Sequence, residues 1–235
     1  MRLSRTPLGV EIHTAAGPLP VRHIIGIGQN YAKHAREMGN AALPERPVVF
    51  TKNPAAAIVS GDAIIIPKIC QDQEQVDFEG ELAIVIGAAA RDVPKADAHR
   101  VILGYAAAND VSARWWQKQG SGGQFCRGKS FDTFCPLGEV TPAAEVKNPN
   151  ALRLVTRVNG QVMQDETTGD MIFDVSTLVS ELSRGTTLLP GTVILTGTPS
   201  GVGTARKPPV YLKAGDTVEV EIEGLAAVRN PVRAE

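Results

Sequence analysis

Two glutamates, two positions apart, are the first residues in this sequence whose types and spacing suggest chemistry. Glu79 and Glu81 stand at the beginning of an apolar, β-branched run that ends at Gly87 and is typical of a buried strand. Alternate residues of a strand point to the same face, so both carboxylates should project side by side. Like charges at this spacing raise each other's pKa unless a cation lies between them.

The glutamate pair alone leaves two interpretations open. Strands often begin with charged residues, so both side chains could lie in water at an exposed strand end. The other interpretation is a divalent-cation site made of oxygen ligands, for which Mg²⁺ or Ca²⁺ is suited. A third carboxylate would favour the metal site, and Asp110, after the apolar run 101–108, offers one.

His34 and Glu37 form a second pair with chemical potential. They lie in residues 31–38, whose pattern predicts a short helix that ends at Gly39. Residues three positions apart share one helix face, so the two side chains can meet. Taken alone, the pair fits a surface helix without a function better than it fits an acid–base dyad.

Residues 123–130 (GQFCRGKS) match the phosphate-binding loop G-x-x-x-x-G-K-[ST] literally. That motif needs a strand before it and a helix after it, whose N-terminus points at the phosphate. Here the preceding segment is polar and rich in glycine, and Pro136 and Gly138 stand where the helix should run. We interpret the match as accidental, which leaves Lys129 as a cation in a polar loop or a solvated lysine.

The elements that must position these residues are mostly strands. The hydrophobic patterns predict strands at residues 10–13, 22–26, 48–51, 63–66, 77–87, 101–109, 152–158, 161–164, 193–196 and 217–223. Asn159-Gly160 gives the strongest hairpin signal in the chain, and 16–18 is expected to be a turn.

Helices are expected to be few and short. Besides residues 31–38, we expect a helical turn at 94–98, a helix at 111–119 capped by Asp110 or Ser112, and a helix at 173–183. Residues 40–47 and 120–127 should form loops. Many strands, few short helices and no βαβ alternation predict an α+β, β-rich fold.

Length and composition limit the class of protein. The 235 residues suit one domain, 1–235, in which residues 1–22 form a short β appendage. A net charge of −1 without a basic run gives no sign of a nucleic-acid or membrane partner. Three cysteines without a CxxC spacing argue against structural zinc, and with no signal peptide pattern they predict a cytoplasmic location.

Five motifs in a fixed order resemble the fumarylacetoacetate hydrolase family in its compact single-domain form. They lie at 28–37 (GQNYAKHARE), 79–82 (EGEL), 109–114 (NDVSAR), 128–131 (GKSF) and 196–199 (TGTP). The resemblance extends from about residue 24 to residue 228. It implies a fumarylacetoacetate hydrolase C-terminal-like mixed β-sandwich roll, usually found as a homodimer.

The resemblance also assigns roles to residues of this chain. It implies Mg²⁺ or Mn²⁺ held by Glu79, Glu81 and Asp110. It implies catalytic roles for His34, Glu37 and Lys129, and contacts to substrate from Arg114, Gln117 and Thr198. Three positions depart from the pattern of many relatives: Phe78 replaces a histidine, Trp115 an aspartate and Gln29 a basic residue. The last two lie near the expected pocket, so they bear on the identity of the substrate.

The function implied is metal-dependent hydrolysis of a C–C bond in a 2,4-dioxo acid, such as an acylpyruvate, to pyruvate and a carboxylic acid. The same site would stabilise an enolate however it arises. Oxaloacetate decarboxylation, and isomerisation or hydration of an unsaturated 2-oxo diacid, are therefore alternatives. A nucleotide-binding protein that uses residues 123–130 is an alternative of another class, and it would bind ATP through Lys129.

Overall fold

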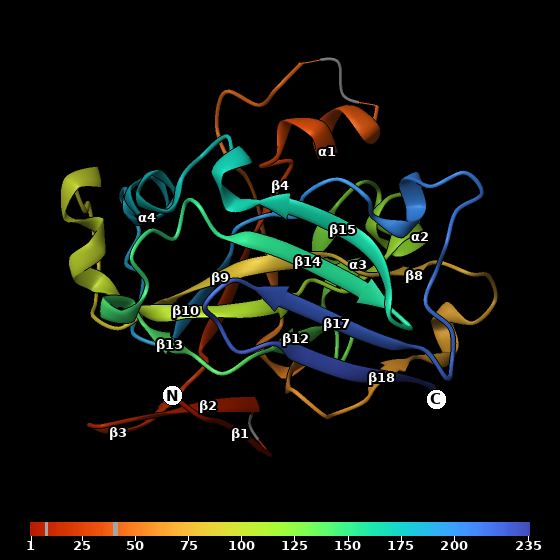
Figure 1. Ribbon diagram of the computed structural model, residues 1–235, viewed down its shortest axis with the longest axis horizontal. Helices are drawn as coiled ribbons and strands as arrows, with labels where there is room; N and C mark the ends of the chain where they lie inside the picture. Colours follow the sequence, from red (N-terminus) through yellow and green to blue (C-terminus); the bar gives the residue numbers. More distant parts are fainter. Residues whose placement is uncertain (8, 40–41) are drawn as a thin grey trace.

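A mixed sheet forms the centre of the computed structural model, which describes residues 1–7, 9–39 and 42–235 (Figure 1). Its strands run in the order β5 (Val48–Lys52), β4 (His23–Gly28), β16 (Thr192–Leu195), β9 (Gly80–Ile86), β10 (Ile102–Asn109), β12 (Cys135–Leu137) and β6 (Ala57–Val59), and β13 (Thr141–Pro142) pairs with β10. The sequence motifs that suggested chemistry lie at the ends of these strands.

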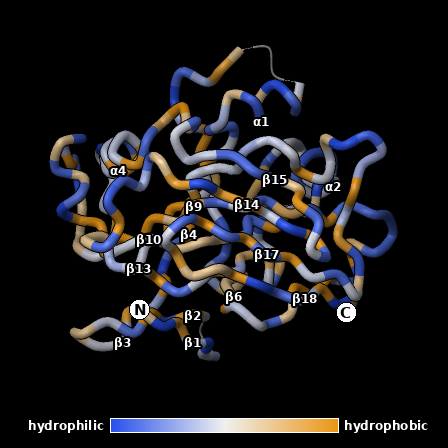
Figure 2. The backbone as a smooth tube through the Cα atoms, in the orientation of Figure 1, coloured by the Kyte–Doolittle hydropathy of each residue, from blue (hydrophilic) through white to orange (hydrophobic). Residues whose placement is uncertain are grey.

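Every residue of β9 is buried, because the central sheet is covered on both faces. Leu82 and Ile84 belong to one hydrophobic core, while Ala83 and Val85 belong to the other. A strand that is buried on both faces reads as a continuous apolar run, which is what the sequence shows here. Figure 2 shows these hydrophobic stretches running through the middle of the molecule, where β4, β9 and β10 lie.

A second sheet of five strands covers one face of the central sheet. Its order is β15 (Gln161–Thr167), β14 (Arg153–Val158), β17 (Thr217–Ile222), β18 (Val228–Ala234) and β7 (Ile64–Ile66). Leu154 and Val220 from this sheet and Leu178 from α4 (Val175–Ser183) share the core of Leu82 and Ile84. The predicted hairpin is confirmed, since Asn159 and Gly160 have φ of 51° and 80° between β14 and β15.

A third, small sheet covers the opposite face. It contains β1 (Leu3–Thr6), β2 (Gly9–Thr14) and β3 (Gly17–Pro20). Val10 and Ile12 of β2 pack in the same core as Ala83 and Val85 of β9. Because this sheet shares a core with the central one, we propose that residues 1–235 form one domain with 1–22 as its appendage.

Short elements complete the structure around the ends of the central strands. They are β8 (Val76–Asp77), β11 (Ser112–Ala113), α1 (Ala32–Glu37), α2 (Arg114–Gln117), α3 (Phe125–Lys129) and the 3₁₀ helices η1 (Pro54–Ala56), η2 (Lys68–Cys70), η3 (Lys95–Val101), η4 (Gln119–Ser121), η5 (Ala143–Glu145), η6 (Thr168–Asp170) and η7 (Gly203–Ala205). Among the described residues, no helix has the length and apolar character needed to cross a membrane.

The β-rich α+β fold is confirmed, whereas several local predictions need correction. The helix expected at 111–119 is limited to α2, because residues 112–113 pair with β8. Ala113 is its N-cap, so neither Asp110 nor Ser112 caps it. The turn expected at 16–18 falls earlier, since Gly17 already pairs with Thr14 in a hairpin.

Two predicted loops also differ in detail from the structure. The loop predicted at 120–127 contains the first turn of α3, which begins at Phe125. Within the loop predicted at 40–47, residues 42–47 form no helix or strand, and residues 40 and 41 lie outside the described part of the chain.

Candidate active site

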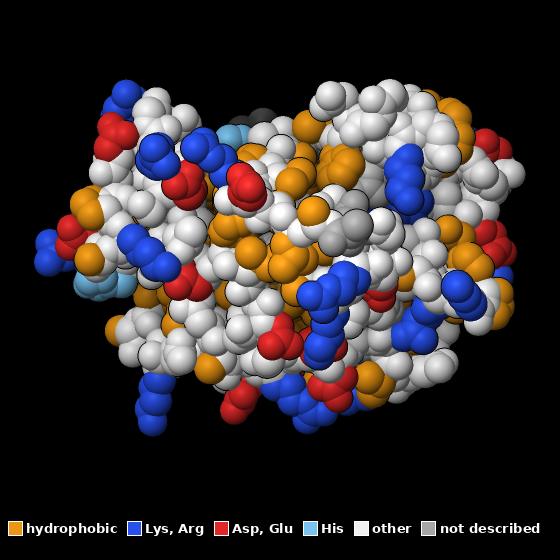
Figure 3. Space-filling model, turned by 90° about the horizontal axis from the view of Figure 1, so that it is seen from above, with side chains coloured by type: hydrophobic (Ala, Val, Ile, Leu, Met, Phe, Trp, Pro, Cys, Tyr) orange, Lys and Arg blue, Asp and Glu red, His pale blue; other side chains and the backbone are white. Residues whose placement is uncertain are grey.

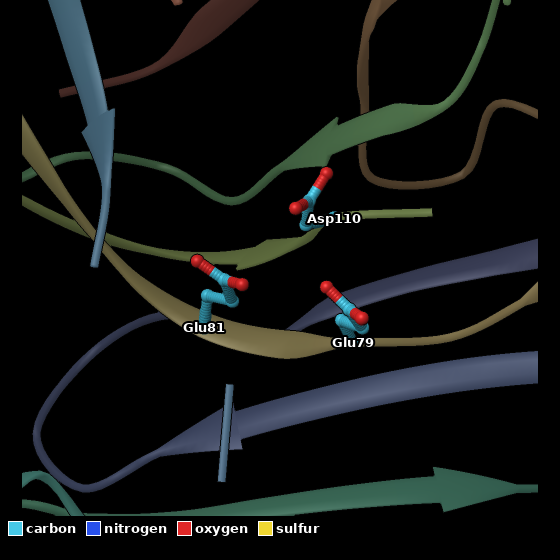
Figure 4. A group of neighbouring side chains, drawn as sticks. All are labelled: Glu79, Glu81 and Asp110. Atoms are coloured by element: carbon cyan, nitrogen blue, oxygen red, sulfur yellow. The ribbon is translucent and has the colours of Figure 1, made fainter. Parts of the chain in front are cut away.

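Three buried carboxylates meet where β9 and β10 pair. Glu79 immediately precedes β9, Glu81 belongs to it, and Asp110 directly follows β10. The antiparallel register sets Asn109 opposite Gly80, and the Asp110 amide donates to the Glu79 carbonyl at 2.8 Å. One oxygen from each carboxylate lies within 4.8 Å of the other two (Figure 4). The structure therefore brings together the three residues for which the sequence predicted a metal site.

Two of these carboxylates are paired with buried cations. Lys129 Nζ lies 2.6 Å from Glu79 Oε2 and 2.5 Å from Asp110 Oδ2. Lys52 Nζ, from β5, lies 2.5 Å from Asp110 Oδ1. The pKa of Lys129 is raised: burial acts against its charge, and the Asp110 and Glu79 carboxylates outweigh that effect. Lys129 is thus a buried cation between two carboxylates and neither of the alternatives that its sequence context suggested.

Glu81 is the carboxylate without a Lys or Arg partner among the described residues. It is 1% exposed, and its one hydrogen bond is from the Gly197 amide at 2.7 Å. Burial raises its pKa well above the usual value, and the charges of Asp110 and Glu79 raise it further. An unpaired buried carboxylate beside two others gives an oxygen-only donor set, which fits a hard divalent cation.

Asp77 anchors the surroundings of the site, although the sequence analysis assigned it no role. Its carboxylate accepts hydrogen bonds from Arg114 Nε at 2.9 Å and from the amides of Gly203 and Thr204 at 2.8 and 2.9 Å. Arg114 in turn lies 2.7 Å from Glu79 Oε1. Burial lowers the pKa of Arg114, but Asp77 and Glu79 reverse that effect and raise it. Asp77 therefore joins the 203–204 segment to the carboxylate cluster.

Glu79 remains ionised because of these neighbours. Burial raises its pKa, whereas the charges of Lys129 and Arg114 lower it further than burial raises it. The two adjacent glutamates thus have opposite pKa shifts, because Glu79 has two cationic partners and Glu81 has none.

His34 and Glu37 form the hydrogen-bonded pair that their spacing permits. His34 Nδ1 lies 2.8 Å from Glu37 Oε1 on α1, and His34 is buried. The Glu37 carboxylate also accepts from the Gly201 amide at 3.0 Å, which holds α1 against the segment after β16. With Nδ1 engaged, Nε2 is the ring nitrogen left for the cavity that His34 lines.

Thr198 lies at the cavity wall, held by β9 and β15. Its hydroxyl donates to the Gly80 carbonyl at 2.9 Å and lies 2.8 Å from Gln164 Nε2. Gln164 Oε1 accepts from the Gly80 amide at 2.9 Å. Gln164 is fully enclosed, and its sequence context, a strand of a hairpin, carried no sign of this position.

A cavity of about 190 Å³ connects these groups. Its lining comprises Ile27, Gly28, Gln29, His34, Met38, Phe50, Glu79, Glu81, Arg114, Gln117, Lys118, Phe125, Lys129 and Thr198. Gln117 is oriented by Arg114, whose Nη1 donates to its Oε1 at 3.0 Å. Figure 3 looks onto the molecule from the α1 side and shows hydrophobic side chains near the middle of this face, with Lys and Arg side chains around them. Seven of the nine candidate site residues line the cavity. Of the other two, Asp110 lies beside Glu79 and Glu81 in the triad, and Glu37 lies behind His34.

The literal phosphate-loop match has a different structure from a phosphate-binding loop. No strand precedes it, since 3₁₀ helix η4 and a turn lead into it, and α3 lies within the motif itself. Gly128 is needed for close packing, because a Cβ there would lie 2.4 Å from the Gln117 amide nitrogen. The motif therefore packs α3 against α2 and brings Lys129 to the carboxylates.

Comparisons with known proteins identify the family of this chain. The model of the fumarylacetoacetate (FAA) hydrolase C-terminal family matches residues 23–233. An oxaloacetate tautomerase from Xenopus laevis mitochondria is 45% identical over 210 residues, which cover 89% of this chain and 65% of that protein. The oxaloacetate tautomerase YisK of Bacillus subtilis is 42% identical over 225 residues, which cover 95% of this chain and 73% of that protein.

A solved structure extends the similarity to the whole chain. Fumarylpyruvate hydrolase from Pseudomonas aeruginosa, in complex with Mn²⁺ and pyruvate, has a TM-score of 0.86 at 30% identity and covers 100% of both chains. By contrast, the chain spans less than two thirds of the Xenopus relative. The family match takes in each candidate site residue from His34 to Thr198 and the fold that assembles them, so this chain belongs to the fumarylacetoacetate hydrolase family.

Proposed function

We propose that this protein is a divalent-metal-dependent enzyme that interconverts the enol and keto forms of oxaloacetate. The observation that carries the proposal is the buried carboxylate triad, with Lys129 bound to two of its members, in one small cavity with the His34–Glu37 pair. The names of the tautomerase relatives, at 42–45% identity, favour this reaction over others of the family.

The donor set suits the cofactor that such chemistry needs. Glu79, Glu81 and Asp110 would hold Mg²⁺ or Mn²⁺, and the Mn²⁺ of the Pseudomonas relative is in line with this assignment. When bound, the cation supplies positive charge that polarises a 2-oxo group and stabilises the charge of an enolate.

His34 is proposed to move the proton at C3. Its Nε2 takes a proton from C3 of the keto form, and the electron pair becomes the C2–C3 double bond of the enolate. The oxygen at C2 then takes a proton from water to give the enol, His34 releases its proton to water, and the reverse sequence returns the keto form. Glu37 keeps the ring oriented, since it bonds Nδ1 and is itself fixed by the Gly201 amide.

Other side chains would bind the substrate. A lysine ammonium has three N–H donors, and two of those of Lys129 are directed at Glu79 and Asp110, which leaves one for an enolate oxygen. Gln117 accepts from Arg114, so its amide N–H groups are free to donate to a substrate carboxylate. The Thr198 proton is used by the Gly80 carbonyl, so Thr198 is proposed to shape the wall.

C–C hydrolysis of an acylpyruvate is the second candidate. Glu37 orients His34, and a histidine oriented by a carboxylate can act as the base that activates water. The similarity to the Pseudomonas hydrolase also extends over the whole chain. In that reaction His34 would take a proton from water, and the hydroxide would attack C4 of a 2,4-dioxo acid. The C3–C4 bond would then break, C3 would take up the proton that His34 removed from water, and pyruvate and a carboxylic acid would leave.

One experiment separates these reactions. The enol absorbance of oxaloacetate and of acetylpyruvate is followed with Mg²⁺ and with chelator, and the products are identified by NMR. A metal-dependent loss of the oxaloacetate enol signal without loss of carbon supports the tautomerase. Formation of acetate and pyruvate from acetylpyruvate would instead show that the protein is a hydrolase. Formation of pyruvate and carbon dioxide from oxaloacetate would show that it is a decarboxylase.

The partners and the compartment remain predictions. The family resemblance predicts a homodimer, which light scattering of the purified chain would test. A cytoplasmic location is proposed, and a mitochondrial one is the alternative that the name of the Xenopus relative suggests; fractionation of cells that express the protein would test the two.

A further inference from the structure

Lys118 differs from the other Lys and Arg residues of the cavity in its lack of a carboxylate partner among the described residues. Of the Lys and Arg residues that line it, Arg114 is paired with Asp77 and Glu79, and Lys129 with Glu79 and Asp110. In the described ranges, no carboxylate forms an ion pair with Lys118, which is exposed. Lys118 is therefore the cavity cation whose charge is available to an incoming anion.

The backbone of Lys118 is firmly held. It ends α2, where its amide donates to the carbonyls of Arg114 and Trp115, both at 3.2 Å, and its carbonyl accepts from the Gly123 amide at 2.7 Å. The close packing at Gly128 fixes α2 against α3, which carries Lys129. The Lys118 side chain thus starts from a position that is fixed relative to the carboxylate cluster.

The charges of the buried cluster explain why a substrate with two carboxylates needs a cation outside that cluster. With all of its carboxylates ionised, as metal binding requires, the cluster has four negative charges (Asp77, Glu79, Glu81 and Asp110) and three positive ones (Lys52, Arg114 and Lys129), which leaves one negative charge. A divalent cation would convert this to one positive charge, which one substrate carboxylate would offset. A second carboxylate on the substrate would find no compensating charge within the cluster.

We propose that Lys118 binds the distal carboxylate of a substrate with two acid groups, so that the cavity selects 2-oxo diacids over 2-oxo monoacids. The inference rests on the proposed function, because it takes the first carboxylate and the 2-oxo group to lie at the triad. It adds a specificity-determining residue that the family motifs do not include. The cavity volume of about 190 Å³ suits a substrate of this small size.

The test compares two ligands that do not react and differ by one carboxylate. Malate and lactate are titrated into the Mg²⁺-loaded protein, and binding is followed by NMR, which resolves millimolar affinities. We expect malate to bind more tightly than lactate. Lys118→Met should weaken malate binding roughly five- to tenfold, as expected for one partly exposed charge-assisted contact, and change lactate binding less than twofold. Lys118→Arg should retain most of the malate affinity.

Lys147 provides the matched control. It is an exposed lysine outside the cavity lining and has no ion pair in the described ranges, so Lys147→Met removes the same charge from the molecule. Equal malate and lactate affinities in the unchanged protein would overturn the inference. So would an unchanged malate affinity in Lys118→Met, or an equal loss in Lys147→Met. Selective malate binding through Lys118 without tautomerase activity would overturn the proposed reaction alone.

Discussion

At the scale of single residues, the site depends on a carboxylate that the protein leaves uncompensated. Lys129, Arg114 and Lys52 bind Glu79 and Asp110, whereas Glu81 receives one backbone N–H. A buried charge without a partner is costly, which explains why its pKa is raised. A bound cation would supply the positive charge that Glu81 lacks, so an unpaired buried carboxylate fits a metal ligand.

Glu81→Gln should abolish the binding of Mg²⁺ while the protein remains folded. The amide oxygen can still accept from Gly197, and the change removes one of several like charges from a buried site. Calorimetric titration with Mg²⁺ checks this, with exposed Glu145→Gln as the control. Metal binding to the unchanged protein should also weaken as pH falls, because protons compete for Glu81. Retention of Mg²⁺ affinity in Glu81→Gln would contradict the assignment.

His34→Ala should lower turnover by about 10²–10⁴-fold, the usual contribution of a general acid–base group, and leave metal affinity unchanged. The reason is that His34 bonds Glu37 and forms no ion pair with the triad among the described residues. Steady-state kinetics and Mg²⁺ calorimetry measure the two effects. If metal binding fell together with turnover, the separate roles of the pair and the triad would be wrong.

At the scale of elements, the N-terminus of α4 gives a prediction about stability. Asp174 accepts from the Thr177 amide at 2.8 Å and lies 2.9 Å from Lys95 Nζ. Asp174→Ala should lower the free energy of unfolding by about 1 kcal/mol, the typical value of an N-cap. Thermal unfolding should show a fall in Tm of about 2–4 °C, compared with exposed Asp132→Ala as the control.

The Asp174 effect should depend on pH in a defined direction. Burial raises its pKa, but hydrogen bonds from Thr177 and Lys95 lower it below the usual value. The folded pKa therefore lies below the unfolded one, so the stabilisation is complete above about pH 4 and is lost as pH falls further. This account would be contradicted if the difference in Tm between the unchanged protein and Asp174→Ala became larger as the pH is lowered.

Much of the fold was predictable from the sequence where the signal is local. The hydrophobic runs of β9 and β10 and the Asn159-Gly160 turn each predicted their own structure. The strands β6 and β12 were missed, because each spans three residues and pairs only with distant parts of the chain. Short strands of this kind are formed by the tertiary context, which no local pattern carries.

The same distinction applies to the site. Strand alternation predicted that Glu79 and Glu81 project side by side and offered Asp110 as a third carboxylate, and the family resemblance implied that the three form one site; the pairing of β9 with β10 brings them together. Lys52 lies at the end of β5 and reaches Asp110 across the site from a distant part of the chain. Asp77 binds segments more than 30 residues away. Their contacts come from the packing of separate elements, so their positions in the sequence gave no sign of them.

At the scale of the whole molecule, the carboxylate cluster links elements from both halves of the chain. β9 and β10 carry the triad, β5, α2 and α3 carry its cations, and the segment after β16 bonds Glu81 and Asp77. These elements belong to or surround the central sheet, which is covered on both faces (Figure 1). A ligand of the triad should therefore stabilise the whole fold and not one loop.

Divalent metal should accordingly raise the temperature of global unfolding. A ligand at 100 times its Kd that binds only the folded state contributes about 2.7 kcal/mol, which corresponds to roughly 5–10 °C in Tm for a chain of this size. Calorimetric scans with Mg²⁺ and with chelator measure the shift, which Glu81→Gln should lose and Glu145→Gln should keep. Because Glu81→Gln also relieves repulsion, its Tm in chelator should equal or exceed that of the unchanged protein. If the Tm is the same in Mg²⁺ and in chelator, Lys129 and its cationic neighbours already neutralise the carboxylates. The assignment of a metal site to the triad would then be wrong.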